Sequence, residues 1–374
     1  MKEKYLLLSL LLFSCLLQGC SKQENTTEDP APILPGEVNE STGTELEESV
    51  TLSDTVKEGF YRSPLTNEWV PLGTEDYRPI AVMFNNIQVA CPQSNISKVG
   101  VMYECPVEGS LTRLMGIIEN YDKFEKIGPI RSCRDYFVYW ALEWDSIYCH
   151  FGGPELYVDT ILNQDYVNNL DGLKLDGGTN KNASVYYRVT DRKAPHNAYL
   201  NGAGVDRGIE KMSYRKTYTE NYQPNHYRFA SESSPTDLSS NADAINAFHI
   251  EPGYLINKPY FEYNKSDGLY YRWQYGEKHI DAETGEQLAF KNIILQNTYY
   301  ETRDAKGYLA FQCHDTTRGG FYITNGSSIP ITWEKTTDFG ATKYYDSNGN
   351  EIVLNTGKTF ICIIQDQNKE SIIK

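Results

Sequence analysis

The sequence lacks an excess of positive charge and lacks a long apolar segment. Its 35 Lys and Arg stand against 50 Asp and Glu, which gives a net charge of −15 at pH 7. We expect no nucleic-acid partner, because such a surface needs clustered basic side chains. The longest apolar run, residues 5–17, has 13 residues, whereas a membrane-spanning helix needs about 20. Apolar and charged contents of 40% and 23% are typical of a globular protein.

The motifs that mark common metal, cofactor and repeat proteins are missing as well. The six His residues never occur as HxH, HxxH or HExxH, and there is no CxxC pair. Neither a phosphate-binding loop nor a dinucleotide-binding glycine fingerprint is present. We therefore expect no metal ion and no cofactor. No repeat of fixed period occurs, which argues against a solenoid or a propeller.

The first 19 residues have the features of a lipoprotein signal peptide. Lys2 and Lys4 precede the apolar run, and the segment ends in Leu-Gln-Gly before Cys20. This pattern resembles the bacterial lipobox, in which the chain is cut before the cysteine and lipid is attached to the sulfur. We therefore expect lipidation at Cys20, with palmitate in the anchor, and export to the outer face of the cytoplasmic membrane.

Residues 20–58 are predicted to be a lipidated cysteine followed by a disordered acidic tether. Residues 21–58 contain ten acidic and two basic side chains, three prolines and no aromatic residue. Such a composition buries too little apolar surface to offset the entropy lost on ordering. The tether would hold a folded part near the membrane or the cell wall.

The cysteines leave the disulfide state open. Cys15 leaves with the signal peptide and Cys20 carries lipid, which leaves an even number in an exported chain and permits disulfides. Cys149 and Cys362 lie in apolar runs, where a thiol behaves as a small buried apolar group. The remaining six are Cys91, Cys105, Cys133, Cys149, Cys313 and Cys362.

Hydrophobic patterning predicts an α+β fold, in which a mixed α/β layered domain precedes a mostly antiparallel β domain. We expect strands at residues 80–86, 101–105, 112–119 and 147–151. Ser132 and Asp135 form a capping box before an apolar helical stripe made of Phe137, Trp140, Ala141 and Trp144. Pro154 fits the first position of a second helix.

The second half of the chain has the sequence pattern of a β domain. Turn signals at residues 265–268, 325–326 and 347–350 separate short apolar runs. A segment rich in Ser, Asp and Asn precedes them and predicts a linker or a long loop. We therefore predict an N-terminal domain at 59–229, a linker at 230–245 and a C-terminal domain at 246–374.

Polar residues near the two predicted helix starts suggest an anion site. Arg131 and Arg134 lie around the N-terminus of the first predicted helix, and His150-Phe-Gly152-Gly153 leads from a strand into the second. Free N–H groups at such a turn hold anions, and His150 can exchange a proton. The alternative is that Arg131 and Arg134 form ordinary ion pairs.

Two further groups are candidates with structural alternatives. Arg192, His196 and Asn197 lie around Pro195 on a defined loop, where they either contact a ligand or brace the loop. Glu104 and Glu108 are candidates for acid–base chemistry, or else are solvated or salt-bridged carboxylates. Cys133 has basic neighbours on both sides, Arg131 and Arg134. Their positive charges could stabilise its thiolate and so activate it as a nucleophile.

Several segments, in order, resemble the YerB-like bacterial lipoproteins. They are RPIAVMFNN, PQSNISKVGVMYE, EGSLTR, IGPIRSCRDYF, HFGG, RKAPHN, and WEK followed by DSNGNEIVLNTGKTFI. The resemblance covers about residues 75–366. It implies an exported lipoprotein of a Gram-positive bacterium with two domains of unknown function. Cys91 and Cys133 depart from the family pattern.

The resemblance brings no established activity, so three interpretations stand beside one another. The first is a membrane-anchored binding or scaffold protein with a polar cleft for an anionic or cell-wall-derived ligand. The second is a cell-envelope hydrolase or transferase that uses a His/Glu pair. The third is an interaction module whose Tyr-rich C-terminal sheet binds a protein partner.

Overall fold

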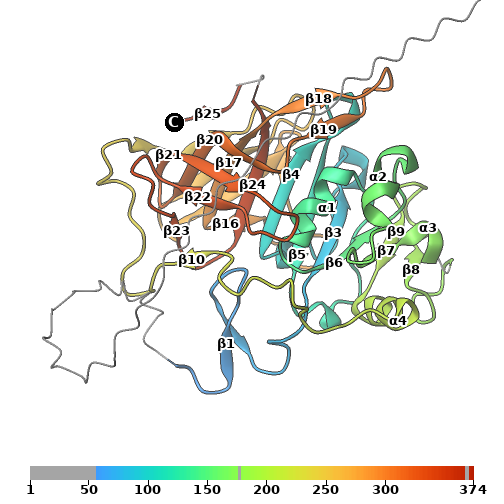
Figure 1. Ribbon diagram of the computed structural model, residues 1–374. Coiled ribbons are helices and arrows are strands. Elements are labelled where there is room, and N and C mark those ends of the chain that lie inside the picture. Colours follow the sequence, from blue (N-terminus) through green and yellow to red (C-terminus); the bar gives the residue numbers. More distant parts are fainter. Residues whose placement is uncertain (1–55, 176–177, 367–369) are drawn as a thin grey trace, which may run out of the picture. The chain divides into compact units, whose positions relative to one another are not determined.

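The computed structural model describes residues 56–175, 178–366 and 370–374 (Figure 1). The predicted signal peptide, Cys20 and nearly all of the predicted tether lie outside these residues. The described residues belong to one compact unit. None of the helices in this part of the chain is long and apolar enough to cross a membrane.

One large sheet of 11 strands forms the centre of the described part. Its strands in spatial order are β11 (Ile245–Asn246), β21 (Ser327–Lys335), β20 (Asp315–Thr324), β17 (Asn292–Thr298), β24 (Thr359–Gln365), β4 (Val101–Pro106), β5 (Thr112–Ile118), β3 (Ile80–Asn85), β6 (Ile147–His150) and β7 (Asn169–Asp171), with β22 (Lys343–Tyr345) paired to β21. Strands β17, β24, β4, β3, β6 and β7 run in one direction.

Strand β24 joins the two halves of the chain. It pairs in parallel with β17 on one side, where Ile294 lies opposite Ile361, and with β4 on the other, where Glu104 lies opposite Cys362. The fold class is α+β, and the C-terminal half is mostly antiparallel apart from this strand. The boundary between two domains remains a prediction, because both halves contribute to one continuous sheet.

Helices cover one face of the N-terminal half of this sheet. Helices α1 (Asp135–Leu142) and α2 (Glu155–Leu162) pack there (Figure 1). The four residues of the predicted apolar stripe are all buried, but helix α1 ends at Leu142, so Trp144 lies beyond the helix and the stripe is confirmed only for the other three. The predicted cap is wrong, because Arg134 is the N-cap residue and makes no side-chain capping bond. Ser132 O accepts from Arg113 and Cys133 N donates to Gly152 O, so this segment is extended rather than helical.

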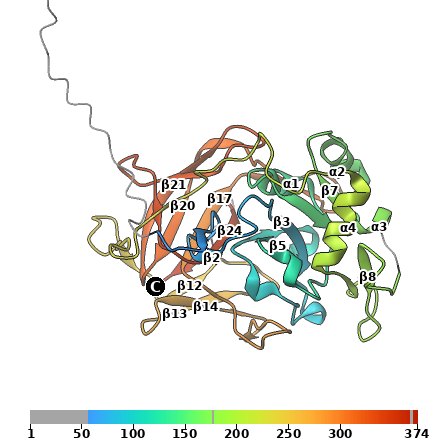
Figure 2. The same cartoon turned by 90° about the horizontal axis from the view of Figure 1, so that it is seen from below.

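The opposite face is covered by helix α4 (Gly202–Met212) and by a second, six-stranded sheet (Figure 2). Phe261 and Phe290 of the second sheet pack edge-on against Phe360 of β24.

The second sheet contains β12 (His249–Glu251), β13 (Tyr260–Asn264), β14 (Leu269–Gln274), β15 (Glu277–Lys278), β16 (Ala289–Phe290) and β25 (Ile372–Ile373). The predicted turns at 265–268 and 325–326 are confirmed as hairpins, which join β13 to β14 and β20 to β21.

Short elements complete the described part. Residues 230–244 form neither helix nor strand, but Leu238 is buried and Thr236 is hydrogen-bonded to Asn355. The other short elements are the pairs β1 (Phe60–Arg62) with β2 (Trp69–Pro71), β8 (Tyr186–Arg188) with β9 (Ala198–Leu200), β10 (Arg228–Phe229) with β23 (Val353–Leu354), and β18 (Tyr300–Thr302) with β19 (Leu309–Phe311), together with helix α3 (Gly172–Leu175).

Candidate functional site

Several of the predicted site residues lie at one edge of the large sheet. Because β3, β4, β6 and β24 run in the same direction, their carboxyl ends meet there. In sheets of this kind, ligands bind outside the carboxyl ends of parallel strands. The structure brings Glu108, Arg131, Arg134 and His196 to this edge, and it places the other candidates in structural roles.

Arg131 and His196 form the open part of this edge. Asn85, at the end of β3, donates from Nδ2 to Nδ1 of His196 over 2.8 Å, which leaves the proton of the neutral ring on Nε2. Burial, with the nearby charges of Arg131 and Arg192, lowers the pKa of His196. Arg131 is partly exposed, and no described residue forms a hydrogen bond or an ion pair with its guanidinium group. Burial and the charge of Arg134 lower its pKa.

Arg134 and Glu108 form a two-pronged ion pair beside them. Nε and Nη2 of Arg134 donate to the two carboxylate oxygens of Glu108, each over 2.5 Å. Nη1 of Arg134 donates to Cys133 O, and its guanidinium lies 5.4 Å from the ring of Tyr308. The predicted alternative of an ion pair is thus correct for Arg134. Arg113 lies behind the pair, where burial and the charge of Arg134 lower its pKa to about 10.

His150 and the glycines after it are packed inside the protein. His150 is fully buried, with Nδ1 3.0 Å from Gly152 O and Nε2 3.2 Å from Asn169 Oδ1. Burial lowers its pKa, and Asp171 at 4.0 Å opposes this shift. A side chain at Gly152 would meet Leu173, and one at Gly153 would meet Cys133 Sγ at 2.8 Å. These glycines therefore serve close packing, and His150 does not reach the edge.

Arg192 and Asn197 brace the loop that carries His196. The guanidinium of Arg192 donates to Ala90 O and Pro92 O over 2.5 and 2.8 Å. Asn197 accepts from Arg188 and donates to Val189 O. The structural alternative is therefore correct for both residues, and the positive charge of Arg192 still acts on His196.

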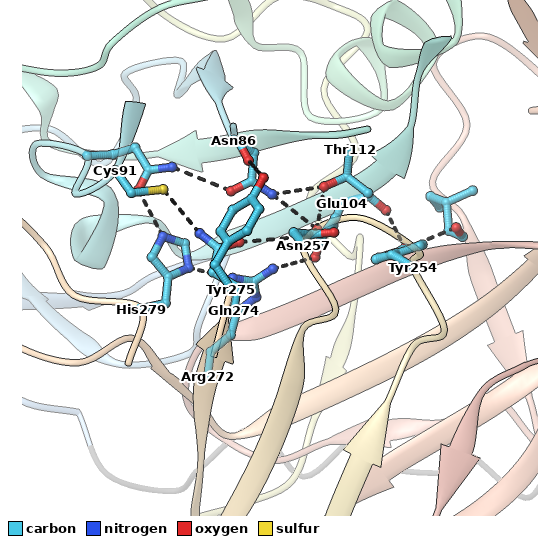
Figure 3. A network of polar contacts seen from close by, with 12 residues as sticks. Asn86, Cys91, Glu104, Thr112, Tyr254, Asn257, Arg272, Gln274, Tyr275 and His279 are labelled. Atoms are coloured by element: carbon cyan, nitrogen blue, oxygen red, sulfur yellow. Dashed lines mark hydrogen bonds and ion pairs between the residues drawn. The ribbon is translucent and has the colours of Figure 1, made fainter. Parts of the chain in front are cut away.

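Glu104 lies at the centre of a buried polar network (Figure 3). Its carboxylate receives hydrogen bonds from Thr112 and Asn257, each over 2.7 Å, and from Asn86 over 3.2 Å. Nη2 of Arg272, on β14, lies 2.7 Å from its other oxygen, and both side chains are 0% exposed. Glu104 is therefore an anchor between the two halves and cannot touch a ligand from solvent.

The same network fixes the protonation of a second buried histidine. A guanidinium group can only donate, so Nδ1 of His279 accepts from Arg272 over 2.5 Å. Nε2 then carries the proton and donates to Gln93 Oε1 over 2.9 Å. Burial and the charge of Arg272 hold the pKa of His279 well below its usual value. His279 is thus a neutral, structural link.

All six cysteines in the described residues are free, and only Cys91 is partly exposed. Burial raises the pKa of Cys133 to about 12, despite the neighbouring Arg134. Its thiol is therefore protonated and is not an activated nucleophile. Burial likewise raises the pKa of Cys91 to about 11. In the part of the chain that the structure describes, no group of three His, Cys, Asp or Glu residues is placed to hold a metal ion.

The partners that decide these roles are not marked by any motif around the predicted site residues. Asn85, Arg272, His279 and Gln93 were not candidates, because their contacts join segments far apart in the chain. One signal was present for Arg272. It occupies an inward-facing position in the alternating segment LYYRWQ of β14, and a buried arginine requires a carboxylate or several acceptors.

Two family models match successive parts of the chain. The family "Protein of unknown function (DUF3048) N-terminal domain" matches residues 65–215, and its C-terminal counterpart matches residues 250–361. "Putative lipoprotein YerB" of Bacillus subtilis (strain 168) is 27% identical over 327 residues, which is 86% of this chain and 91% of the relative.

A solved structure shares the fold. The crystal structure of the YerB protein from Bacillus subtilis superposes with a TM-score of 0.70 at 25% identity, over 84% of this chain and 99% of that one. With both family domains matched in order and the same fold in a solved relative, the chain belongs to the DUF3048 family of YerB-like proteins, whose function is unknown.

Proposed function

We propose that this protein is an exported lipoprotein that binds an anionic or cell-wall-derived ligand at the edge formed by Arg131 and His196. Lipid on Cys20 would anchor it to the outer face of the cytoplasmic membrane. The lipobox-like sequence and the name of the Bacillus subtilis relative support the anchor. The geometry of the edge supports the ligand class.

The observation that carries the proposal is that the partly buried guanidinium of Arg131 has no acceptor among the described residues. A guanidinium that loses part of its hydration normally gains a carboxylate or several acceptors. Arg131 has neither among the described residues, and the nearby charge of Arg134 repels it. Glu108 is already engaged by Arg134. An incoming carboxylate or phosphate would supply the missing acceptor, with Nε2 of His196 as a second donor.

Replacing Arg131 by Ala should weaken anion binding at least about tenfold, since a charge-assisted hydrogen bond is worth about 1.5–3 kcal/mol. The measurement is the shift of the unfolding midpoint of the full chain in detergent, titrated with inorganic phosphate and with N-acetylmuramate. Arg215→Ala is the matched control, because Arg215 is 59% exposed and lies elsewhere. Equal losses in both variants would show that only net charge matters and would refute the site.

Replacing Cys20 by Ala should abolish incorporation of labelled palmitate and release the protein from the membrane. The thiol of Cys20 is the proposed site of lipid attachment, and alanine offers no sulfur. The measurement is radiolabelled palmitate in the immunoprecipitated chain, beside the fraction found in the medium. Cys15→Ala is the control, because Cys15 lies within the predicted signal peptide. Undiminished labelling of Cys20→Ala would contradict the anchor.

His150 does not support the enzymatic interpretation. Both of its ring nitrogens face acceptor oxygens inside the protein, and the side chain is 0% exposed. A general base must come within hydrogen-bond reach of the proton that it removes. The binding interpretation is therefore the one that the geometry favours.

A further inference from the structure

A cavity of about 290 Å³ lies beside the edge of the large sheet that carries Arg131 and His196. None of the predicted site residues lines it. It is just below the range of about 300–1,000 Å³ that is usual for small-molecule sites. Its walls include Pro106 at the end of β4, Tyr300 just after β17 and Gln365 at the end of β24. Since β17, β24 and β4 are adjacent and parallel, the carboxyl ends of three neighbouring strands open into this cavity.

The back of the cavity is fixed by the buried network. The hydroxyl of Tyr254 lies 3.0 Å from both Glu104 O and Ile363 O, and Thr112 donates to the Glu104 carboxylate over 2.7 Å. Figure 3 shows Tyr254 and Thr112 on either side of Glu104. Both halves of the chain thus hold these walls in place before any ligand arrives. A preformed wall lowers the entropy lost on binding.

The front of the cavity is a short turn that leaves room for a ligand. Gly109 and Ser110 both have left-handed backbone angles, with φ of 69° and 59°. The carboxylate of the preceding residue, Glu108, is clamped by Arg134. A side chain at Gly109 or at Gly307, which both line the cavity, would meet no atom within 4 Å. A ligand can therefore approach the backbone closely at these two glycines.

The chemistry of the lining is neutral and mixed. Among the described residues, no Lys, Arg, His, Asp or Glu lines the cavity. Hydroxyl and amide groups come from Ser110, Thr302 and Gln365, and apolar surface comes from Leu255 and Leu309. A charged ligand would lose hydration without gaining a counter-charge, and a purely apolar one would leave these polar groups unpaired.

We propose that this cavity binds one uncharged sugar ring. A pyranose presents hydroxyl groups around its edge and C–H groups on its faces, which matches a lining of neutral polar groups between apolar walls. The volume fits a single ring rather than an enclosed chain of several. This site is independent of the proposed anion site, because no residue is shared between them.

The test is saturation-transfer NMR of the full chain in a detergent without a sugar headgroup, with N-acetylglucosamine as the probe. Thr302 and Glu301 are neighbours on β18, both exposed, and only Thr302 lines the cavity. Thr302→Trp should fill the cavity and weaken sugar binding at least about tenfold. Glu301→Trp adds the same bulk on the other face of the strand and should bind as the unaltered protein does.

Three results would overturn the proposal. They are no signal with the unaltered protein, equal binding by Thr302→Trp, and equal loss in both tryptophan variants. Gln365→Ala provides a second test that adds no bulk and should also weaken binding. Arg131→Ala should keep sugar binding while it loses the phosphate response, so failure of either site can be told from failure of the other. Melting curves of every variant confirm that it is folded.

Discussion

Replacing Arg272 by Met should lower the free energy of unfolding by about 3–5 kcal/mol, because the change leaves a buried carboxylate without its cation. Glu104 and Arg272 are both 0% exposed, and their atoms lie 2.7 Å apart. The loss also removes the donor to Nδ1 of His279. Glu104 belongs to the first half of the chain and Arg272 to the second. The change should therefore lower the stability of both halves.

Urea unfolding followed by tryptophan fluorescence and by circular dichroism measures this effect. The double variant Glu104→Leu with Arg272→Met should recover much of the loss, because no buried charge remains without a partner. Lys278→Met on neighbouring β15 is the control, since Lys278 is exposed. A loss of less than about 1 kcal/mol in Arg272→Met, which is the usual range for exposed pairs, would contradict the role given to this network.

Replacing Lys335 by Met should have a similar effect of about 3–5 kcal/mol through a second buried pair. Nζ of Lys335 lies 3.4 Å from the carboxylate of Glu143, and both side chains are 0% exposed. The same Nζ donates to Asp338 O and Gly340 O. Glu143 also accepts from the hydroxyls of Tyr103 and Thr342, so its negative charge would stay buried after the change.

Thermal and urea unfolding of Lys335→Met, beside Lys98→Met, measures this second effect. Lys98 pairs with Glu286 over 3.6 Å, but these side chains are 39% and 64% exposed. Exposed pairs contribute about 0–1 kcal/mol. Equal stability changes in the two lysine variants would show that burial of the Glu143–Lys335 pair does not matter.

Local patterning predicted strands β3, β4, β5 and β6 and helices α1 and α2 of the first half, but it did not predict the other strands of that half or helices α3 and α4. The apolar runs at 80–86 and 147–151 form β3 and β6 because each is long enough to cross the sheet and buried on both faces. The pairing of β24 with β4 could not be predicted in the same way. A parallel pair has no turn to fix its register, and these two strands lie in opposite halves of the chain.

The candidate site was predicted in part. Arg131 and His196 could be found as polar residues near strand ends and loops, and the structure places them at the same edge. The roles of Glu104 and His150 could not be found, because burial depends on what the rest of the chain packs over them. Arg272 covers Glu104, and Asn169 closes the site around His150.

The most direct test of the binding account is to follow the arginine side chains while an anion is added. The measurement is a proton–nitrogen correlation spectrum of the Nε–Hε groups in the full chain in detergent, titrated with inorganic phosphate. If an anion binds at this edge, the signal of Arg131 should shift with a saturable curve, while the signals of Arg215 and the buried Arg272 stay unchanged. A spectrum in which Arg131 does not move, or moves only in proportion to exposed Arg215, would contradict the account.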